Sequence, residues 1–104
     1  MKITRSMNGT RLTVALEGRL DTTTAPELEQ ALKESMDGAN ELTMDFAKLD
    51  YISSAGLRVL LSAHKTMMKK GGGSAPSGMK VVNANEMVKE VFDVTGFADI
   101  LGIE

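Results

Sequence analysis

The chain has 104 residues, a formal net charge of −2 and no cysteine. It is long enough for one domain with one hydrophobic core, and disulfides and thiolate metal sites are excluded. The near-balanced charge argues against a nucleic-acid binder, and the single histidine leaves little material for a histidine-ligated metal.

No stretch approaches the roughly 20 apolar residues of a membrane span, and the N-terminus lacks the apolar run of a secretory signal. We therefore expect a single domain over residues 1–104, located in the cytoplasm. We expect it to have no nucleic-acid partner, no membrane span, no metal and no cofactor.

The first third of the sequence predicts a β-hairpin followed by a helix. Residues 3–7 and the alternating Leu12, Val14 and Leu16 indicate two strands. Between them, Asn8-Gly9 is the strongest short hairpin signal, because both turn positions favour positive φ. Thr24 and Glu27 then fit a capping box at the start of a helix that ends at Asp37-Gly38. The apolar residues of this helix recur at helical spacing: Leu28, Ala31, Leu32 and Met36.

The rest of the chain alternates short strands with helices. Strand patterns cover residues 42–46, 49–52 and 79–83, and a helix follows each of the last two. Gly71 ends the first of these helices, whereas Asn83 or Asn85 caps the second and Thr95-Gly96 closes it. Their expected apolar positions are Leu57, Leu60, Leu61, His64 and Met68 in the first, and Met87, Val88, Val91 and Phe92 in the second.

Two segments fall outside this alternation. Residues 71–78, rich in glycine, are predicted to form a mobile surface loop. An apolar tail at the C-terminus is expected to pack back onto the core: Phe97, Ile100, Leu101 and Ile103. The order of elements predicts an α/β fold, with helices covering at least one face of a mixed sheet.

The serine pair Ser53-Ser54 is the main candidate for a functional site. Either hydroxyl can cap the helix that follows, and simple capping accounts for one of them. The second hydroxyl and the small residues Ala55 and Gly56 leave an open approach at the positive end of a helix, which suits a phosphate group. The acidic and hydroxyl-rich run at Asp21 to Thr24 is a helix start, or the rim of the same site if it lies beside Ser54.

Nucleophilic catalysis is not supported by the sequence. The serines lack the first glycine of a G-x-S-x-G elbow, and His64 lies ten residues beyond Ser54, roughly 15 Å along one helix. The glycines at 71–73 are not followed by the lysine and hydroxyl of a phosphate-binding loop. The hypothesis that this is a nucleotide-binding or weakly hydrolytic domain using the Ser54 helix is therefore supported by a generic anion site alone.

Three stretches in order resemble the STAS domains, and within them the anti-sigma-factor antagonists of bacteria. They are residues 17–25 (EGRLDTTTA), 49–61 (LDYISSAGLRVLL) and 91–97 (VFDVTGF). The resemblance implies a small mixed β-sheet of about four to five strands with helices packed against it. The family's motif is Asp, Ser, Ser or Thr, Gly, Leu, and its first serine is phosphorylated by a serine-kinase anti-sigma factor. That acceptor matches Ser54, with Ser53 standing where the family has Asp and with Ala55 in place of the second hydroxyl.

The resemblance implies a partner-switching regulator without an active site of its own. Unphosphorylated, it binds an anti-sigma factor that is a serine kinase, and phosphorylation on Ser54, with Ser53 as the rival acceptor, releases it. The implied docking surface consists of Asp21, Thr22, Thr23, Thr24, Ser53, Ser54, Gly56 and Arg58. The departure at Ser53 favours an alternative, a constitutive and unphosphorylated STAS subunit of a lipid-transport or stress-sensing complex. Whether the chain forms a homo-oligomer stays open.

Overall fold

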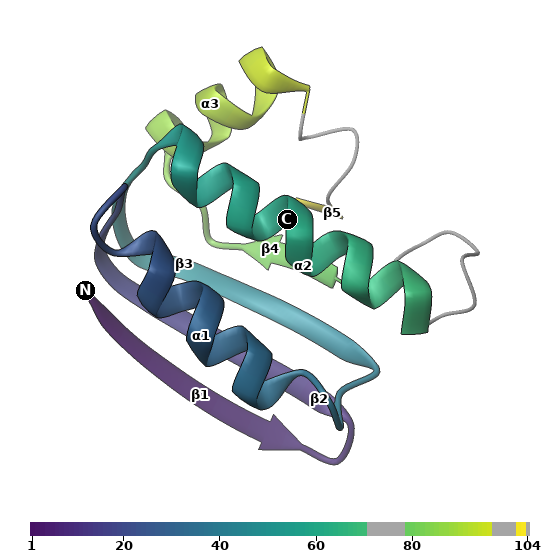
Figure 1. Cartoon of the computed structure of the whole chain (residues 1–104). Coiled ribbons are helices and arrows are strands. Elements are labelled where there is room, and N and C mark those ends of the chain that lie inside the picture. The colour runs from purple at the N-terminus through teal and green to yellow at the C-terminus, as the bar shows by residue number, and fades with distance from the viewer. Residues whose placement is uncertain (71–78, 97–101, 104) are drawn as a thin grey trace.

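A five-stranded sheet organises the molecule in the computed structural model, which describes residues 1–70, 79–96 and 102–103. The elements in chain order are β1 (Lys2–Asn8), β2 (Arg11–Leu20), α1 (Ala25–Ser35), β3 (Glu41–Ile52), α2 (Ser54–Lys70), β4 (Met79–Val82), α3 (Glu86–Thr95) and β5 (Gly102–Ile103). The strands lie side by side in the same order as in the sequence, β1 antiparallel to β2 and the others parallel (Figure 1). The predicted mixed α/β sheet with helices is confirmed.

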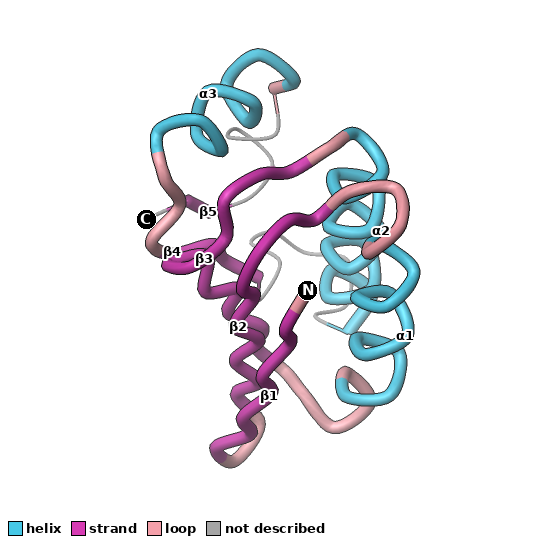
Figure 2. Tube along the Cα trace, turned by 90° about the vertical axis from the view of Figure 1, so that its left-hand side faces the viewer, coloured by secondary structure: helices cyan, strands magenta, loops and turns pink. Residues whose placement is uncertain are grey.

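Helices α1 and α2 cover one face of this sheet, as the side view shows (Figure 2). The core forms between the sheet and its helices because alternate side chains of β2 and β3 are apolar and buried, among them Val14, Leu16, Met44 and Phe46. Helix α3 is tied to the sheet by Phe92, whose ring centroid lies 6.4 Å from that of Phe46. Both rings are fully buried, and each contributes roughly 1.5–3 kcal/mol through the apolar surface that it removes from water.

The turn of the N-terminal hairpin lies one residue later than the sequence predicts. Asn8 is the last residue of β1 and pairs with Arg11, so the two loop residues are Gly9 and Thr10. Of the two positions expected to take positive φ, only Gly9 does so, with φ of 66°. Two-residue loops with glycine first need only that one positive φ, so Asn8 is free to stay in the strand.

The two strand patterns at 42–46 and 49–52 belong to one strand, β3. The register with β2 shifts twice along it, between Ala15 and Glu17 and between Gly18 and Arg19. At the first shift the Asp45 carboxylate accepts hydrogen bonds from Ala47 N at 3.0 Å and from Asn83 Nδ2 at 3.0 Å. The irregularities change the spacing of buried residues from two to three, and this is why the pattern looked like two strands.

Helix α2 buries a wider face than predicted. Leu57, Leu60 and His64 are buried as expected, whereas Leu61 and Met68 are only half-buried. Three residues that the sequence analysis did not assign are also buried: Val59, Ala63 and Met67. The helix packs against both the sheet and its neighbour α1, so its buried face is wider than contact with the sheet alone would require.

Helix α3 is capped by the second of its two predicted candidates. Asn85 Oδ1 accepts a hydrogen bond from Val88 N at 2.8 Å, and Gly96, with φ of 79°, follows the last residue. Met87 was expected on the apolar face but is 45% exposed, because it lies about 100° around the helix from Val88 and about 140° from Phe92.

The predictions for residues 71–78 and for the tail side chains lie outside the described residues, apart from the backbone of β5. Within the described part of the chain, no helix is both long and apolar enough to cross a membrane.

Candidate functional site

Two connections lie next to each other where β2 and β3 end. Leu20 pairs with Ile52, and Ser53 N continues the ladder by donating to Leu20 O at 2.9 Å. The run from Asp21 to Thr24 leads from this point into α1, and Ser53 leads into α2 (Figure 1). The structure thus brings together the two segments that the sequence analysis treated as a site and its rim.

Ser53, and not Ser54, caps helix α2. Its carbonyl accepts a hydrogen bond from Leu57 N at 3.0 Å, and its hydroxyl oxygen accepts a longer one from Gly56 N at 3.4 Å. Ser54 is the first helical residue and is exposed, whereas Ser53 is half-buried. Among the described residues, the Ser54 hydroxyl makes no hydrogen bond. One serine therefore holds the helix start and the other is available to a second molecule.

Gly56 does not offer the open approach that the sequence suggested. It is buried, and a Cβ at this position would lie 2.6 Å from Leu20 Cγ and 3.0 Å from Ile52 Cγ1. The glycine lets the first turn of α2 pack directly on the ends of β2 and β3. Its role in the structure is to position Ser54, because its own surface is turned inward.

Asp21 organises the rim through its own carboxylate. Asp21 Oδ1 accepts hydrogen bonds from Thr23 N at 3.0 Å, from the Thr23 hydroxyl at 2.7 Å and from Thr24 N at 3.2 Å. The bond from the Thr23 hydroxyl is the largest cause holding the pKa of Asp21 below its ordinary value, because it stabilises the charged form. Thr22 is exposed at the tip of this turn.

Thr24 precedes α1, but the capping box predicted for it does not form. Its side chain makes no capping bond to the helix. The Thr24 hydroxyl instead donates to Arg19 O at 2.8 Å and accepts from Asp21 N at 2.8 Å. Thr24 therefore fastens the rim to the end of β2.

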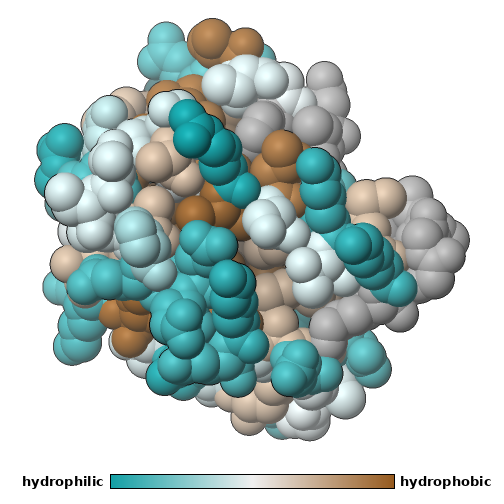
Figure 3. Space-filling view, in the orientation of Figure 1, coloured by the Kyte–Doolittle hydropathy of each residue, from teal (hydrophilic) through white to brown (hydrophobic). Residues whose placement is uncertain are grey.

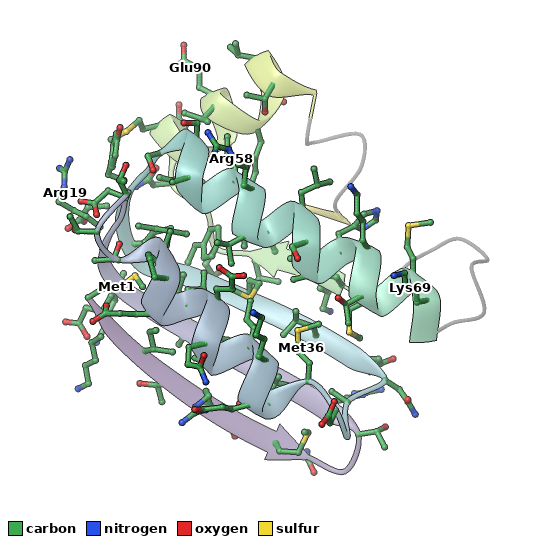
Figure 4. The ribbon with its side chains drawn as sticks, viewed as in Figure 1. Met1, Arg19, Met36, Arg58, Lys69 and Glu90 are labelled. Atoms are coloured by element: carbon green, nitrogen blue, oxygen red, sulfur yellow. The ribbon has the colours of Figure 1, made fainter. Side chains whose placement is uncertain are left out.

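Two arginines flank the site, and they differ in their partners. Arg19 lies over the ring of Tyr51, with its Cζ 4.4 Å from the ring centroid, and its Nε lies 3.8 Å from Asp21 Oδ2. Arg58, on the second turn of α2, is exposed and forms no ion pair within the described residues (Figure 4). The sequence analysis did not assign Tyr51 to the site. Its only signal was an aromatic residue at the end of a strand, since its pairing with Arg19 depends on the shifted register.

Ser54 presents an exposed hydroxyl to which no described group is hydrogen-bonded. His64 is buried further along α2, and no group of three metal-ligating side chains occurs in the described ranges 1–70, 79–96 and 102–103. An apolar hollow of about 210 Å³ lies elsewhere, between α1 and α2, with Leu32, Met36 and Val59 in its lining. A hydroxyl of this kind is suited to react at the active site of another protein.

Comparison with known proteins adds to this geometry. The model of the STAS domain family matches residues 2–104. BtrV of Bordetella bronchiseptica, named as a candidate anti-sigma factor antagonist, is 34% identical over 99% of this chain and 85% of its own. The anti-sigma-B factor antagonist of Bacillus subtilis is 32% identical over 92% of this chain and 84% of its own.

Among solved structures, the anti-sigma factor antagonist SpoIIAA has this fold in two states. Its unphosphorylated form matches with a TM-score of 0.78 and 15% identity, over 99% of this chain and 88% of its own. Its phosphorylated form, from Bacillus, matches with a TM-score of 0.75 and 13% identity, over 99% of this chain and 91% of its own. By the family match and by its relatives, this chain belongs to the STAS domain family.

Proposed function

We propose that this chain is an anti-sigma-factor antagonist of the partner-switching kind, acting in the cytoplasm. It binds an anti-sigma factor with serine-kinase activity while Ser54 is unphosphorylated, and phosphorylation of Ser54 by that kinase releases it. The names of its relatives and the two solved states of SpoIIAA support this function. In this function the chain is a substrate of catalysis and needs no active site.

The observation that carries the proposal is the position of Ser54. It is exposed, it begins α2, and its hydroxyl is free among the described residues, whereas the Ser53 hydroxyl is occupied at the helix start. A kinase needs a hydroxyl that it can reach without unfolding the segment around it. Ser54 meets that need better than the rival acceptor Ser53.

Phosphorylation at this position changes the surface more than the fold. A phosphoryl group adds about −1.5 to −2 charges, and the N-terminus of a helix tolerates negative charge. Helix α2 has no acidic residue in its first turn, so the group would be the first negative charge there. The same charge opposes a partner that has docked against an uncharged serine, which makes binding the quantity that changes.

The proposed docking surface combines the exposed residues of both connections. Thr22 and Thr23 on the rim and Ser54 and Arg58 on α2 are exposed. Asp21 and Ser53 hold the backbone beneath them in place, and buried Gly56 sets the distance between α2 and β2. These last three residues contribute to docking by positioning the exposed ones.

The test uses the serine-kinase anti-sigma factor encoded in the same cell. The protein is incubated with this kinase and ATP, and the added phosphate is located by peptide mass spectrometry, with Ser54→Ala and Ser53→Ala as matched variants. We expect phosphate on Ser54 in the wild type and in Ser53→Ala, and none in Ser54→Ala. Phosphate on Ser53 alone would overturn the assignment.

Binding is then measured with the same kinase in the absence of ATP. Ser54→Asp is expected to weaken binding by at least about 2 kcal/mol, roughly a thirtyfold rise in Kd, because a charge is left unpaired at the interface. Ser54→Ala should bind about as well as the wild type. If both variants bind alike and no phosphate is transferred, the chain is the constitutive subunit instead.

A further inference from the structure

Arg58 lies on the same face of α2 as Ser54, one helical turn further along. Residues four apart in an α-helix have Cβ atoms about 5–6 Å apart, and helical side chains lean toward the N-terminus. The Arg58 guanidinium is therefore placed to extend back over the turn that carries Ser54. Figure 4 shows its side chain standing out from the N-terminal half of α2, on the side of α3.

Arg58 has no acidic partner among the described residues. The four ion pairs in that part of the chain join Arg5 to Glu34, Arg11 to Glu41, Arg19 to Asp21 and Lys33 to Glu29. Glu90 of α3 points outward, away from α2 (Figure 4). An exposed guanidinium beside an exposed serine is thus left without a counter-charge among the residues that the structure describes.

The second arginine at this end of the molecule is already engaged. Arg19 rests on the Tyr51 ring, and its charge lies near Asp21. Turning Arg19 toward Ser54 would give up both contacts, whereas Arg58 gives up no ion pair. The two arginines of the site are therefore not equivalent as partners for a new anion.

The geometry points to Arg58 as the intramolecular partner of a phosphoryl group on Ser54. This inference rests on the proposed function in one respect, that Ser54 is the residue modified. The planar guanidinium can donate two parallel hydrogen bonds to phosphate oxygens, and an acid placed N-terminal to its base at this spacing is the favourable orientation in a helix.

This pairing makes one modification act on two charges of the docking surface. Before phosphorylation, the surface carries a free cation at Arg58 beside a neutral serine. Afterwards, the cation is occupied and the pair together carries about −0.5 to −1, which is +1 added to the phosphoryl charge of about −1.5 to −2. A partner that meets Arg58 with an acidic side chain therefore loses its ion pair at the same step that introduces repulsion.

The inference is tested on protein made with phosphoserine at position 54 by genetic-code expansion, so that no kinase is needed. A ³¹P NMR titration gives the second pKa of the phosphate, which is about 6 without a nearby charge. Arg58→Gln is expected to raise this pKa by about 0.3 to 0.7 unit, because the dianion loses its partner. In Arg58→Lys, which keeps the charge but not the planar guanidinium, the phosphate pKa should lie between that of the wild type and that of Arg58→Gln.

Two matched variants separate this pair from general electrostatics. Lys65 is exposed on the same face of α2 but lies about 16 Å from Ser54 along the helix axis. That distance is twice the screening length of about 8 Å at physiological ionic strength. Lys65→Gln and Arg19→Gln should each move the pKa by less than about 0.2 unit. All other charged groups, among them Asp21, Asp50 and the α3 residues Glu86, Lys89, Glu90 and Asp93, are the same in these variants.

The inference would be overturned if Arg58→Gln raised the phosphate pKa no more than Lys65→Gln does. It would also be overturned if Arg19→Gln raised this pKa more than Arg58→Gln does. Because the phosphoserine is installed during synthesis, a flat titration removes Arg58 as the partner and leaves the proposed switch standing. Conversely, failure of the kinase to modify Ser54 refutes the proposed function and leaves the titration result unchanged.

Discussion

Leu20 packs directly against the α carbon of Gly56, so closely that a Cβ there would lie 2.6 Å from Leu20 Cγ. Leu20 is fully buried at the end of β2, next to the rim that begins at Asp21. The contact therefore couples the rim to the first turn of α2 through one pair of residues. It sets how the two halves of the proposed docking surface stand relative to each other.

Replacing Gly56 with alanine should destabilise the protein by about 1–3 kcal/mol, because the added methyl group meets the branch point of a buried side chain. Chemical denaturation measures the difference. Gly38→Ala is the matched control, since a Cβ at that exposed glycine meets nothing within 4 Å. In a Leu20→Ala background the cost of Gly56→Ala should shrink, and an unchanged cost would show that Leu20 is not the obstacle.

The pKa of Asp21 should lie below its ordinary range, chiefly because the Thr23 hydroxyl donates to the charged carboxylate. A carboxyl whose pKa is lower in the folded than in the unfolded chain stabilises the fold above its unfolded value, near pH 4. That stability is lost as the pH falls through the folded pKa. An NMR titration of the Asp21 carboxyl carbon should show the pKa rising toward its ordinary value in Thr23→Val. Thr22→Val, which removes a hydroxyl not bonded to Asp21, should leave it in place.

Ser53→Asp introduces the acid found at this position in the resembled family, and Ser53→Asn keeps a capping side chain without adding the charge. Both should hold the start of α2, and aspartate should add about 0.5 kcal/mol because negative charge is favourable at a helix N-terminus. We also expect Ser53→Asp to be phosphorylated on Ser54 faster than the wild type by the kinase anti-sigma factor. Equal rates for Ser53→Asp and Ser53→Asn would mean that the acid plays no part in presenting the hydroxyl.

The order of strands and helices was predictable because each depends on a local pattern. The predictions were wrong where contacts with residues distant in the sequence determine the local structure. The Thr24 to Glu27 spacing fits a capping box, but the Thr24 hydroxyl is taken by Arg19 O from the preceding strand. The division of β3 was wrong because the register shifts place Phe46, Leu49 and Ile52 three apart on the buried side. A period of three in buried residues, with Asp45 in front of it, would have been the signal.

In the site, too, the contacts between residues distant in the sequence could not be predicted. The position of Ser54 between a strand and a helix could be predicted from the sequence, and the structure shows that Ser54 begins α2 and is exposed; its role as the phosphorylated residue stays a prediction. The missing side chain of Gly56 was visible in the sequence, but the neighbour that fills its place was not, because Leu20 lies 36 residues earlier. Likewise, the stacking of Arg19 on Tyr51 follows from a pairing that only the folded sheet establishes.

Because the strands lie in the sheet in the order of synthesis, each strand after β1 can pair with the strand that was made just before it. Strands β2 and β3, both connections of the site and Arg58 all belong to the first 58 residues. As this part of the chain leaves the ribosome first, β2 and β3 can pair with each other, and so bring the two connections of the site together, before β4 is made. The later strands then extend the sheet on the side away from β1.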